Sequence, residues 1–345
     1  MTIFQNFESP EYFVMKEVFR AKNMEQYLAH MVEEFIYQDV KTYYDNGQMR
    51  EAYRTKYGEI HGDYKQWYDN GQLKIQTNFV DGKIHGEFKK LYPNGQLQFQ
   101  RTFVDGKKHG DYTQWYDNGQ LEMYITYIDG ERHGDYKEWY NNGQLKIQTK
   151  YVAGKTHGEY KAWYDNGKLH KKATYVDGII HGEFKEWYNN GRFAVQTPYV
   201  AGKIHGEVRS WHYNGRFAAQ TPYVAGKIHG EFKEWYDNGQ LLKQTTYVAG
   251  EIHGEFKTWW ENGQLDQQTT YVAANRHGEY KCWYPNGQLH YQLTYVHGIQ
   301  HGEYKKWDLN GLLVIEITYI DGVDINDYSE FDSDWEDHVY VEGDN

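Results

Sequence analysis

The chain has 345 residues, a formal net charge of −12 and an aromatic content of 18%, with 35 Tyr and 12 Trp. Residues 323–345 hold nine acidic and no basic side chains, residues 1–36 hold six acidic and three basic, and the stretch between them is neutral with 34 of each sign. A neutral array with an acidic end argues against nucleic-acid binding, which needs a net basic surface, and it offers no general attraction to anionic lipid.

The single cysteine, Cys282, rules out a disulfide within the chain and suits a reducing compartment. No apolar run approaches the ~20 residues that a membrane-spanning helix needs. The N-terminus also lacks the basic, apolar and small-residue order of a secretory signal. We therefore expect a cytoplasmic protein.

Residues 1–36 stand outside the repeats described below and favour helix. Ser9 and Pro10 fit an N-cap followed by the first helical position. A capping-box-like segment at 23–26 is followed by apolar residues at helical spacing. We predict a short α-helical cap over the open edge of the first repeat. A docking helix for a partner is the alternative.

The rest of the chain follows a period of 24 residues without insertion. Asn-Gly recurs twelve times, from Asn46 to Asn310. His-Gly marks the units that begin at His61, His85, His109, His133, His157, His181, His205, His229, His253, His277 and His301. Such a period indicates a repeat architecture in which each unit contacts its neighbours. We assign a half-repeat to 37–60 and the whole array to 37–322.

Two strand-like runs flank Asn-Gly in every unit, both rich in aromatic residues, Thr and Val, and both bounded by Gly-containing turns. This pattern is typical of a β-hairpin. The sequence therefore predicts an all-β repeat array, an elongated and twisted antiparallel β-meander of about 24 short strands with two strands per repeat.

Turn chemistry adds detail to the hairpins. Pro93, placed just before Asn-Gly, fits a type I turn followed by a left-handed Gly bulge. The second turn of each unit is Asp-Gly or Ala-Gly, and Ala274 replaces that Gly once, so we expect a strained or longer turn there. Pro198 and Pro222 lack a backbone donor and should lie outside the regular ladder.

Alternation of side chains along a strand assigns residues to the two faces of the sheet. In the unit that begins at His229, Phe232, Leu241, Thr245 and Tyr247 should share the more apolar face. Trp235 should lie on the other face.

Residues 323–345 lose the period and become acidic. Such composition is typical of a solvated, disordered end. Trp335, Val339, Tyr340 and Val341 are apolar exceptions. They leave two further interpretations open, a segment folded onto the last strand and a short linear motif for a partner.

The repeat resembles the MORN repeat in its variant form. The resemblance rests on Gly-Glu-Phe-Lys-Glu-Trp-Tyr-Asp-Asn-Gly-Gln-Leu, starting at Gly230, and on the Tyr-Val-x-Gly and His-Gly that follow, and it covers 37–322. It implies an antiparallel hairpin array. The family occurs in bacterial proteins, some labelled antitoxin components, and in large DNA viruses of protists, with roles in protein binding. Links of MORN arrays to membranes carry over weakly to a neutral array.

The repeated histidines, acids and turns do not predict catalysis. Equivalent histidines lie two strands apart, about 9.6 Å, whereas zinc ligands reach within about 2.1 Å of one ion. The acid two residues after each His recurs in every unit, although catalysis needs one distinctive site. Cys282 occupies a position filled by Ala162 and Thr258 elsewhere, with no dedicated His partner. We expect no enzyme activity, metal or cofactor.

The tryptophans form the best candidate interaction stripe, because interface hot spots favour Trp, Tyr and Arg. Shielding of the second face of a one-layer sheet is the alternative. Trp260 is one aromatic residue that the repeat does not demand. The candidate residues are Trp67, Trp115, Trp139, Trp163, Trp187, Trp211, Trp235, Trp259, Trp260, Trp283 and Trp307.

These observations favour a non-enzymatic repeat scaffold that binds an unknown protein partner and no nucleic acid. A structural spacer is one alternative, favoured by the near-identity of 192–207 and 216–231, which differ only at Val195 and Ala219. A peripheral membrane or lipid-binding protein is the other alternative.

Overall fold

The computed structural model describes residues 36–325. The predicted helical cap, apart from Ile36, and residues 326–345 of the acidic end lie outside this part of the chain. The described residues form thirty strands that belong to one open antiparallel sheet, and no helix among them is long and apolar enough to cross a membrane. The prediction of an all-β antiparallel meander is confirmed.

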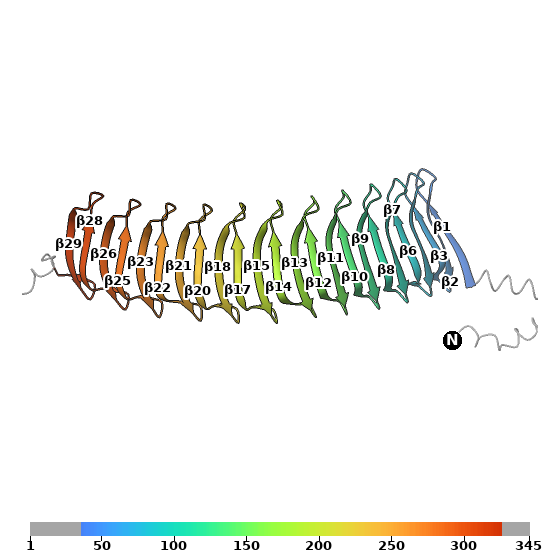
Figure 1. Ribbon diagram of the computed structural model, residues 1–345. Helices are drawn as coiled ribbons and strands as arrows, with labels where there is room; N and C mark the ends of the chain where they lie inside the picture. The colour runs from blue at the N-terminus through green and yellow to red at the C-terminus, as the bar shows by residue number, and fades with distance from the viewer. Residues whose placement is uncertain (1–35, 326–345) are drawn as a thin grey trace, which may run out of the picture. The chain divides into compact units, whose positions relative to one another are not determined.

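Contacts divide the chain into two compact units, and the first has described residues 36–158 and 165–167. Its strands follow one another in chain order (Figure 1). They are β1 (Tyr37–Tyr43), β2 (Met49–Lys56), β3 (Glu59–Trp67), β4 (Leu73–Val80), β5 (Lys83–Ile84), β6 (Gly86–Leu91), β7 (Leu97–Val104), β8 (Lys107–Trp115), β9 (Leu121–Ile128), β10 (Glu131–Trp139) and β11 (Leu145–Val152).

The second unit has described residues 159–164 and 168–325, and β12 (Lys155–Trp163) spans the division. Its remaining strands are β13 (Leu169–Val176), β14 (Ile179–Trp187), β15 (Phe193–Val200), β16 (Lys203–Ile204), β17 (Gly206–Trp211), β18 (Phe217–Val224), β19 (Lys227–Ile228), β20 (Gly230–Trp235), β21 (Leu241–Val248), β22 (Glu251–Trp259), β23 (Leu265–Val272), β24 (Asn275–Arg276), β25 (Gly278–Trp283), β26 (Leu289–Val296), β27 (Ile299–Gln300), β28 (Gly302–Trp307), β29 (Leu313–Ile320) and β30 (Val323–Asp324).

The strand count follows from the repeat. Twenty-four strands have six or more residues, two for each repeat, and six have only two residues. Five of the short ones are the first part of a strand that is interrupted at the repeat histidine, as β19 and β20 are at His229. The sixth, β30, pairs with the end of β29.

A bulge at His-Gly causes this interruption. Between β21 and β22, Thr245 pairs with Phe256 and Thr246 pairs with His253, so Gly254 and Glu255 have no counterpart. Gly254 has a φ of 79°, in the left-handed region that a glycine adopts easily. His-Gly therefore forms a bulge that bends the strand.

Pro198 lies in β15, opposite this bulge. β15 pairs with β16 through Tyr199 and with β17 through Gln196, and Pro198 faces the gap between the two pairings. Its carbonyl accepts a hydrogen bond from the backbone N–H of His205 at 3.0 Å. The N–H and C=O of a strand residue point to the same side, so the missing donor of proline falls where the ladder is already broken.

The Asn-Gly turn has the hydrogen bonds of a type I turn with a Gly bulge. The N–H of Gly239 donates to the carbonyl of Tyr236, and the N–H of Tyr236 donates to the carbonyl of Gln240, both at 2.9 Å. Gly239 has a φ of 90°. This is the turn that the sequence predicts.

The second turn has two residues, both with positive φ. Val248 pairs with Glu251, which leaves Ala249 and Gly250 at φ values of 53° and 98°. Such a turn matches the twist of a hairpin but strains any residue that has a Cβ. At the exceptional Ala274, φ is 64° and the turn keeps its two-residue length. Of the two expectations for this turn, strain is therefore the one observed.

One face of the sheet carries a thin core. Thr245 lies opposite Phe232 and is 1% exposed, and the ring of Phe232 meets the ring of Tyr247 edge to face at 6.2 Å. The residues at the equivalent position, mostly Thr or Ala, form a buried column beside such aromatic pairs. In the second unit, this column contains Ala173, Thr197, Thr245, Thr269 and Leu293.

Replacing Ala274 with Gly should stabilise the protein by about 1 kcal/mol, because glycine adopts positive φ without the steric penalty of a Cβ. Gly250→Ala, at the same position one unit earlier and with open space around the added Cβ, should destabilise by a similar amount. Urea unfolding of both variants measures the two changes, and equal signs would contradict the argument.

Thr245→Val should also stabilise, by about 1 kcal/mol, because the buried hydroxyl of Thr245 has no hydrogen-bond partner. Val keeps the shape of the side chain, and Leu293 fills the equivalent position without a polar atom. The exposed Thr270 provides the control, since Thr270→Val should leave the unfolding midpoint unchanged. A lower midpoint for Thr245→Val would show that the hydroxyl contributes to stability.

Candidate interaction surface

Side chains of the Asn-Gly turn join consecutive repeats. Asn238 accepts a hydrogen bond from the backbone N–H of Gln240 at 2.8 Å, inside its own turn. Its amide nitrogen donates to the carbonyl of Glu261, in the next turn, at 2.8 Å. Asn46, Asn70, Asn94, Asn118, Asn190, Asn214 and Asn262 each make the same pair of bonds. These bonds fix each of these turns against the next one.

A second set of bonds positions the tryptophans. The hydroxyl of Tyr188 donates to the carbonyl of Trp211 at 2.7 Å, and that of Tyr236 donates to the carbonyl of Trp259 at 2.9 Å. The same bond joins Tyr44 to Trp67, Tyr92 to Trp115, Tyr116 to Trp139, Tyr164 to Trp187 and Tyr284 to Trp307. His212 replaces Tyr once, and its Nε2 donates to the carbonyl of Trp235.

Trp260 belongs to this second set. Its indole N–H donates to the carbonyl of Trp283 at 3.2 Å, where a Tyr hydroxyl donates in most other repeats. Tyr, His and Trp share an aromatic ring with a hydrogen-bond donor at its far end. The structure therefore places Trp260 in the Tyr position and apart from the other ten candidate tryptophans.

The other ten tryptophans occupy one repeat position, the last residue of the first strand of a hairpin. All ten are half-buried, and Leu91 takes the position once. They are Trp67, Trp115, Trp139, Trp163, Trp187, Trp211, Trp235, Trp259, Trp283 and Trp307.

The sequence prediction for Leu241 is wrong. The register shifts between Glu234 and Trp235, so that Trp235 pairs with Leu241 while Glu234 pairs with Lys243. A shift of one residue moves a side chain to the opposite face of a sheet. The extra residue, Leu242, therefore moves Leu241 from the face of Thr245 to that of Trp235.

Trp and its partner together form a continuous apolar row, which we call the Trp–Leu stripe. In the second unit, the rings of Trp187, Phe193, Trp211, Phe217 and Trp235 follow one another with centroid distances of 5.1, 5.5, 5.4 and 5.9 Å. Phe193 and Phe217 are 41% and 46% exposed. The regular spacing of tryptophan in the sequence does not by itself show that the row is continuous.

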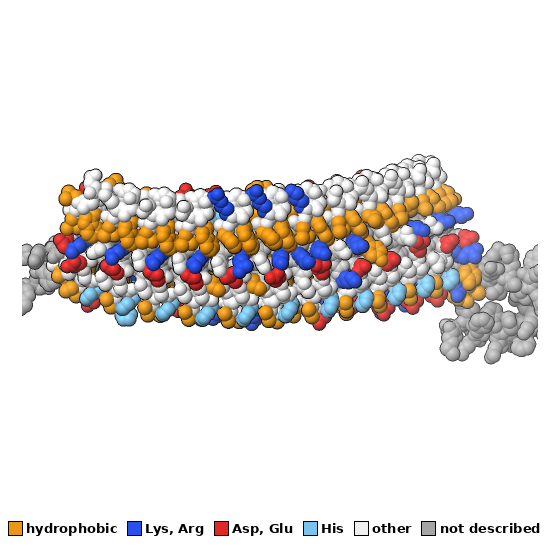
Figure 2. Space-filling model, in the orientation of Figure 1, with side chains coloured by type: hydrophobic (Ala, Val, Ile, Leu, Met, Phe, Trp, Pro, Cys, Tyr) orange, Lys and Arg blue, Asp and Glu red, His pale blue; other side chains and the backbone are white. Residues whose placement is uncertain are grey.

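Paired charges border the stripe. Lys233 lies 2.8 Å from Glu231, two residues away on the same strand, and Gln244 also donates to Glu231. Lys257 and Glu255 repeat the pair at 2.6 Å. The hydrogen bond from Lys233 lowers the pKa of Glu231 below its usual value. In Figure 2, hydrophobic side chains adjoin a row in which basic and acidic side chains alternate, and histidines follow beyond it.

Five of the repeat histidines contact the next two-residue turn along the chain. Nδ1 of His229 accepts a hydrogen bond from the backbone N–H of Ala249 at 3.2 Å, and His205 and Ala225 form the same contact at 3.3 Å. An accepting Nδ1 leaves the ring proton on Nε2. Among residues 36–325, no group of three or more His, Cys, Asp or Glu side chains could hold a metal ion.

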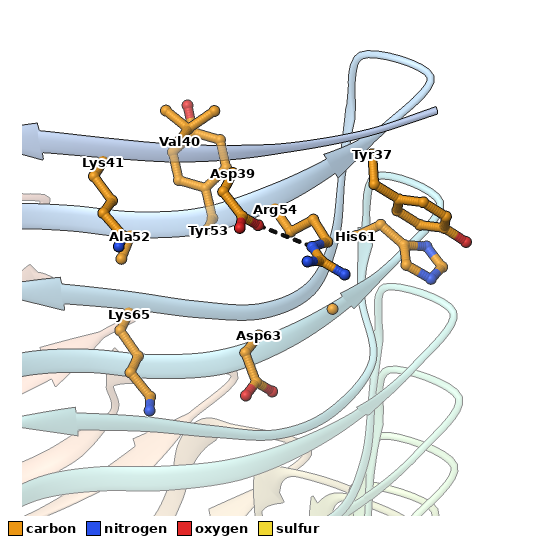
Figure 3. Close-up of a pocket in the computed structure, with 11 residues that line it drawn as sticks. Tyr37, Asp39, Val40, Lys41, Ala52, Tyr53, Arg54, His61, Asp63 and Lys65 are labelled. Atoms are coloured by element: carbon orange, nitrogen blue, oxygen red, sulfur yellow. Dashed lines mark hydrogen bonds and ion pairs between the residues drawn. The ribbon is translucent and has the colours of Figure 1, made fainter. Parts of the chain in front are cut away.

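An open hollow of about 730 Å³, which no motif in the sequence indicates, lies beside β1. In Figure 3, Asp39 and Arg54 point toward each other, and their side chains are 2.9 Å apart. Arg54 lies over the ring of Tyr37, and that ring meets His61 edge to face. Arg54 lowers the pKa of Asp39 by hydrogen bonding and charge. Lys41, Asp63 and Lys65 also line the hollow, so charges of both signs leave it without a distinct ligand preference.

Cys282 is a free, buried thiol beside Tyr280 and Leu293. Burial raises the pKa of this thiol. Because the thiolate is the nucleophilic form, such burial disfavours reaction.

Nine segments of the chain match the family model of the MORN repeat variant. They are 60–81, 84–105, 108–129, 132–153, 156–177, 228–249, 252–273, 276–297 and 300–321. Together they cover more than half of the chain. The protein belongs to the MORN repeat variant family, and the resemblance inferred from the repeat is confirmed.

Other comparisons add little to this assignment. No curated protein matches the sequence. Among solved structures, the chain is similar to "Crystal Structure of TcdB2-TccC3 without hypervariable C-terminal region", with 12% sequence identity and a TM-score of 0.18. The alignment covers 83% of this chain and 17% of that chain.

The role of the donor at position 260 can be tested with two variants. Trp260→Phe should lower the free energy of unfolding more than Trp260→Tyr does, by about 1 kcal/mol, because only Tyr restores a donor to the carbonyl of Trp283. Urea unfolding of both variants measures the difference. Equal stability would show that ring packing alone determines this position.

Proposed function

We propose that this protein is a non-enzymatic repeat scaffold that binds a protein partner along the Trp–Leu stripe. The main support for this proposal is the stripe itself, a row of half-buried Trp side chains that alternate with Leu or Phe. Tyr, His and Trp donors hold the backbone of the stripe in place from the repeat before. A rigid apolar row can therefore receive a partner with little loss of conformational entropy.

The chemistry of the surroundings supports a protein partner. Interface hot spots favour Trp and Tyr, and an apolar centre with a polar rim is typical of protein interfaces. The Lys side chains beside the stripe are paired with Glu, so they are poorly suited to neutralising a run of phosphates or an anionic membrane surface. We place the protein in the cytoplasm because its single cysteine is a buried free thiol.

A purely structural spacer is the second candidate function. The near-identity of 192–207 and 216–231 favours it, because addition of a whole unit lengthens an array of this kind without new contacts. A spacer needs no apolar row of fixed composition, so substitution in the stripe separates the two functions.

The test changes two of the more exposed leucines of the stripe. Leu121→Gln with Leu313→Gln should reduce recovery of the bound partner about tenfold from a lysate of the source cells, because polar groups in an apolar contact cost about 1.4 kcal/mol or more. Quantitative mass spectrometry of proteins captured by the full-length chain measures the recovery.

Matched controls lie on the same two strands. Ile128→Gln with Ile320→Gln changes residues of similar exposure at the opposite ends of β9 and β29 and should leave recovery unchanged. Circular dichroism and thermal unfolding confirm that both double variants fold. Equal recovery by the stripe variant, its control and the unchanged protein would favour the spacer.

A further inference from the structure

Two adjacent repeats of the second unit reverse the charge of their Asn-Gly turns. A turn such as 237–240, Asp-Asn-Gly-Gln, has a charge of −1. The turns at 189–192 and 213–216 read Asn-Asn-Gly-Arg and Tyr-Asn-Gly-Arg, and each has a charge of +1. One repeat earlier, Lys168 takes the same position as Arg192 and Arg216. Eight other turns have Gln at this position.

These basic side chains adjoin an exposed part of the Trp–Leu stripe. Arg192 precedes Phe193 and Arg216 precedes Phe217. Tyr213, which lies between these pairs in the sequence, is 57% exposed. We call this set the cationic patch. It contains Lys168, Arg192, Phe193, Tyr213, Arg216 and Phe217, all of them exposed.

The arginines are held in place and keep donors available. Nη1 of Arg192 donates to the carbonyl of Asn214 at 2.6 Å, and Nη1 of Arg216 donates to the carbonyl of Asn238. A guanidinium carries five N–H groups in a fixed fork, so the rest can face a carboxylate.

These two repeats also depart from the sequence pattern of the family. The family model matches the repeats on either side and none of residues 178–227. The residues that replace the usual pattern there include both arginines, both phenylalanines and small residues behind them at Ala194 and Ala218. The charge reversal and the departure from the family pattern thus fall in the same two repeats.

The chain itself contains a complementary segment. Residues 326–345 hold eight acidic side chains and no Lys or Arg, together with Tyr328, Phe331, Trp335 and Tyr340. Carboxylates suit the guanidinium forks, and aromatic side chains suit the exposed phenylalanines.

Length argues against this contact within one molecule. β18, which starts with Phe217, is eight strand spacings from β29, about 38 Å. The chain leaves β30 at the other end of the strands from the Asn-Gly turns. This adds a separation of one strand length, about 26 Å, between that point and the cationic residues. The straight distance is then about 46 Å, whereas the twelve residues from Ile325 to Asp337 span at most about 43 Å when fully extended. Within one molecule, this part of the segment could therefore approach Arg216 only when it is almost fully extended, whereas the segment of a second copy meets no such limit.

We propose that the cationic patch binds the acidic C-terminal segment, residues 326–345, of a second copy of this protein. Each copy offers one segment and one patch, so the contact is head-to-tail and can join copies into a chain or a ring. The attraction is between exposed charges, so salt should weaken it. The contact between copies is independent of the proposed protein partner, because the two contacts are tested by substitutions at different residues.

The test is binding of a fluorescent synthetic peptide of residues 326–345 to the full-length protein, followed by anisotropy. Arg192→Gln with Arg216→Gln should weaken binding at least tenfold. Gln occupies this position in eight other turns, so the change should preserve the fold. Raising NaCl from 50 to 500 mM should weaken binding by a similar factor.

A matched control removes the same charge from the same repeats. Lys203→Gln with Lys227→Gln changes exposed residues at the other end of the strands from the Asn-Gly turns. This double variant should alter binding less than twofold. Absence of peptide binding to the unchanged protein would overturn the proposal, as would equal weakening by the two double variants.

A second measurement identifies the copy that donates the segment. Carboxylate-to-lysine cross-linking of mixed ¹⁴N and ¹⁵N full-length protein should yield links between Lys168 and residues 326–345 that join the two isotopes. In sedimentation velocity, the larger species of the unchanged protein should disappear in the arginine double variant. Links confined to single-isotope pairs would overturn a contact between copies.

Discussion

The side-chain amide of the turn asparagine, which in most repeats is bonded to the turn one repeat later, makes the contact on which the rest of the structure depends. Its oxygen satisfies a backbone donor of its own turn, and its nitrogen reaches a carbonyl 23 residues ahead, as in Asn238 and Glu261. A longer or shorter repeat would displace that carbonyl and leave the amide unsatisfied. The bond thus explains why the period of 24 residues has no insertion, and why the tyrosine and histidine contacts recur at fixed offsets.

A fixed period converts each repeat position into a column of like side chains. One face receives the aromatic pairs and a thin buried line of residues that are mostly Thr or Ala. The other receives the Trp–Leu stripe and paired charges. Neither face has the thick core of a two-layer domain, and stability must accumulate over many weak rungs. Individual repeats can therefore tolerate an unsatisfied hydroxyl at Thr245 or a strained alanine at Ala274.

Departures from the period give this array its individual features. Trp260 and His212 replace tyrosine but keep a donor for the same carbonyl, so they conserve the architecture. Arg192 and Arg216 replace glutamine and change the charge of the surface. The first kind of departure concerns stability, and the second distinguishes one stretch of an otherwise uniform scaffold as a place for recognition.

The sequence by itself determined the repeat, the family, the antiparallel hairpins, the Asn-Gly turn and the division of most residues between two faces, because each depends on local spacing and turn chemistry. Only the tertiary structure decided the side of Leu241, since a register shift after Glu234 is invisible in an alternating pattern. It also decided that Trp260 serves as a tyrosine, and that Phe193 and Phe217 close the gaps between tryptophans. These features depend on contacts between repeats, and side chains that lie 23 residues apart meet only when the sheet has formed.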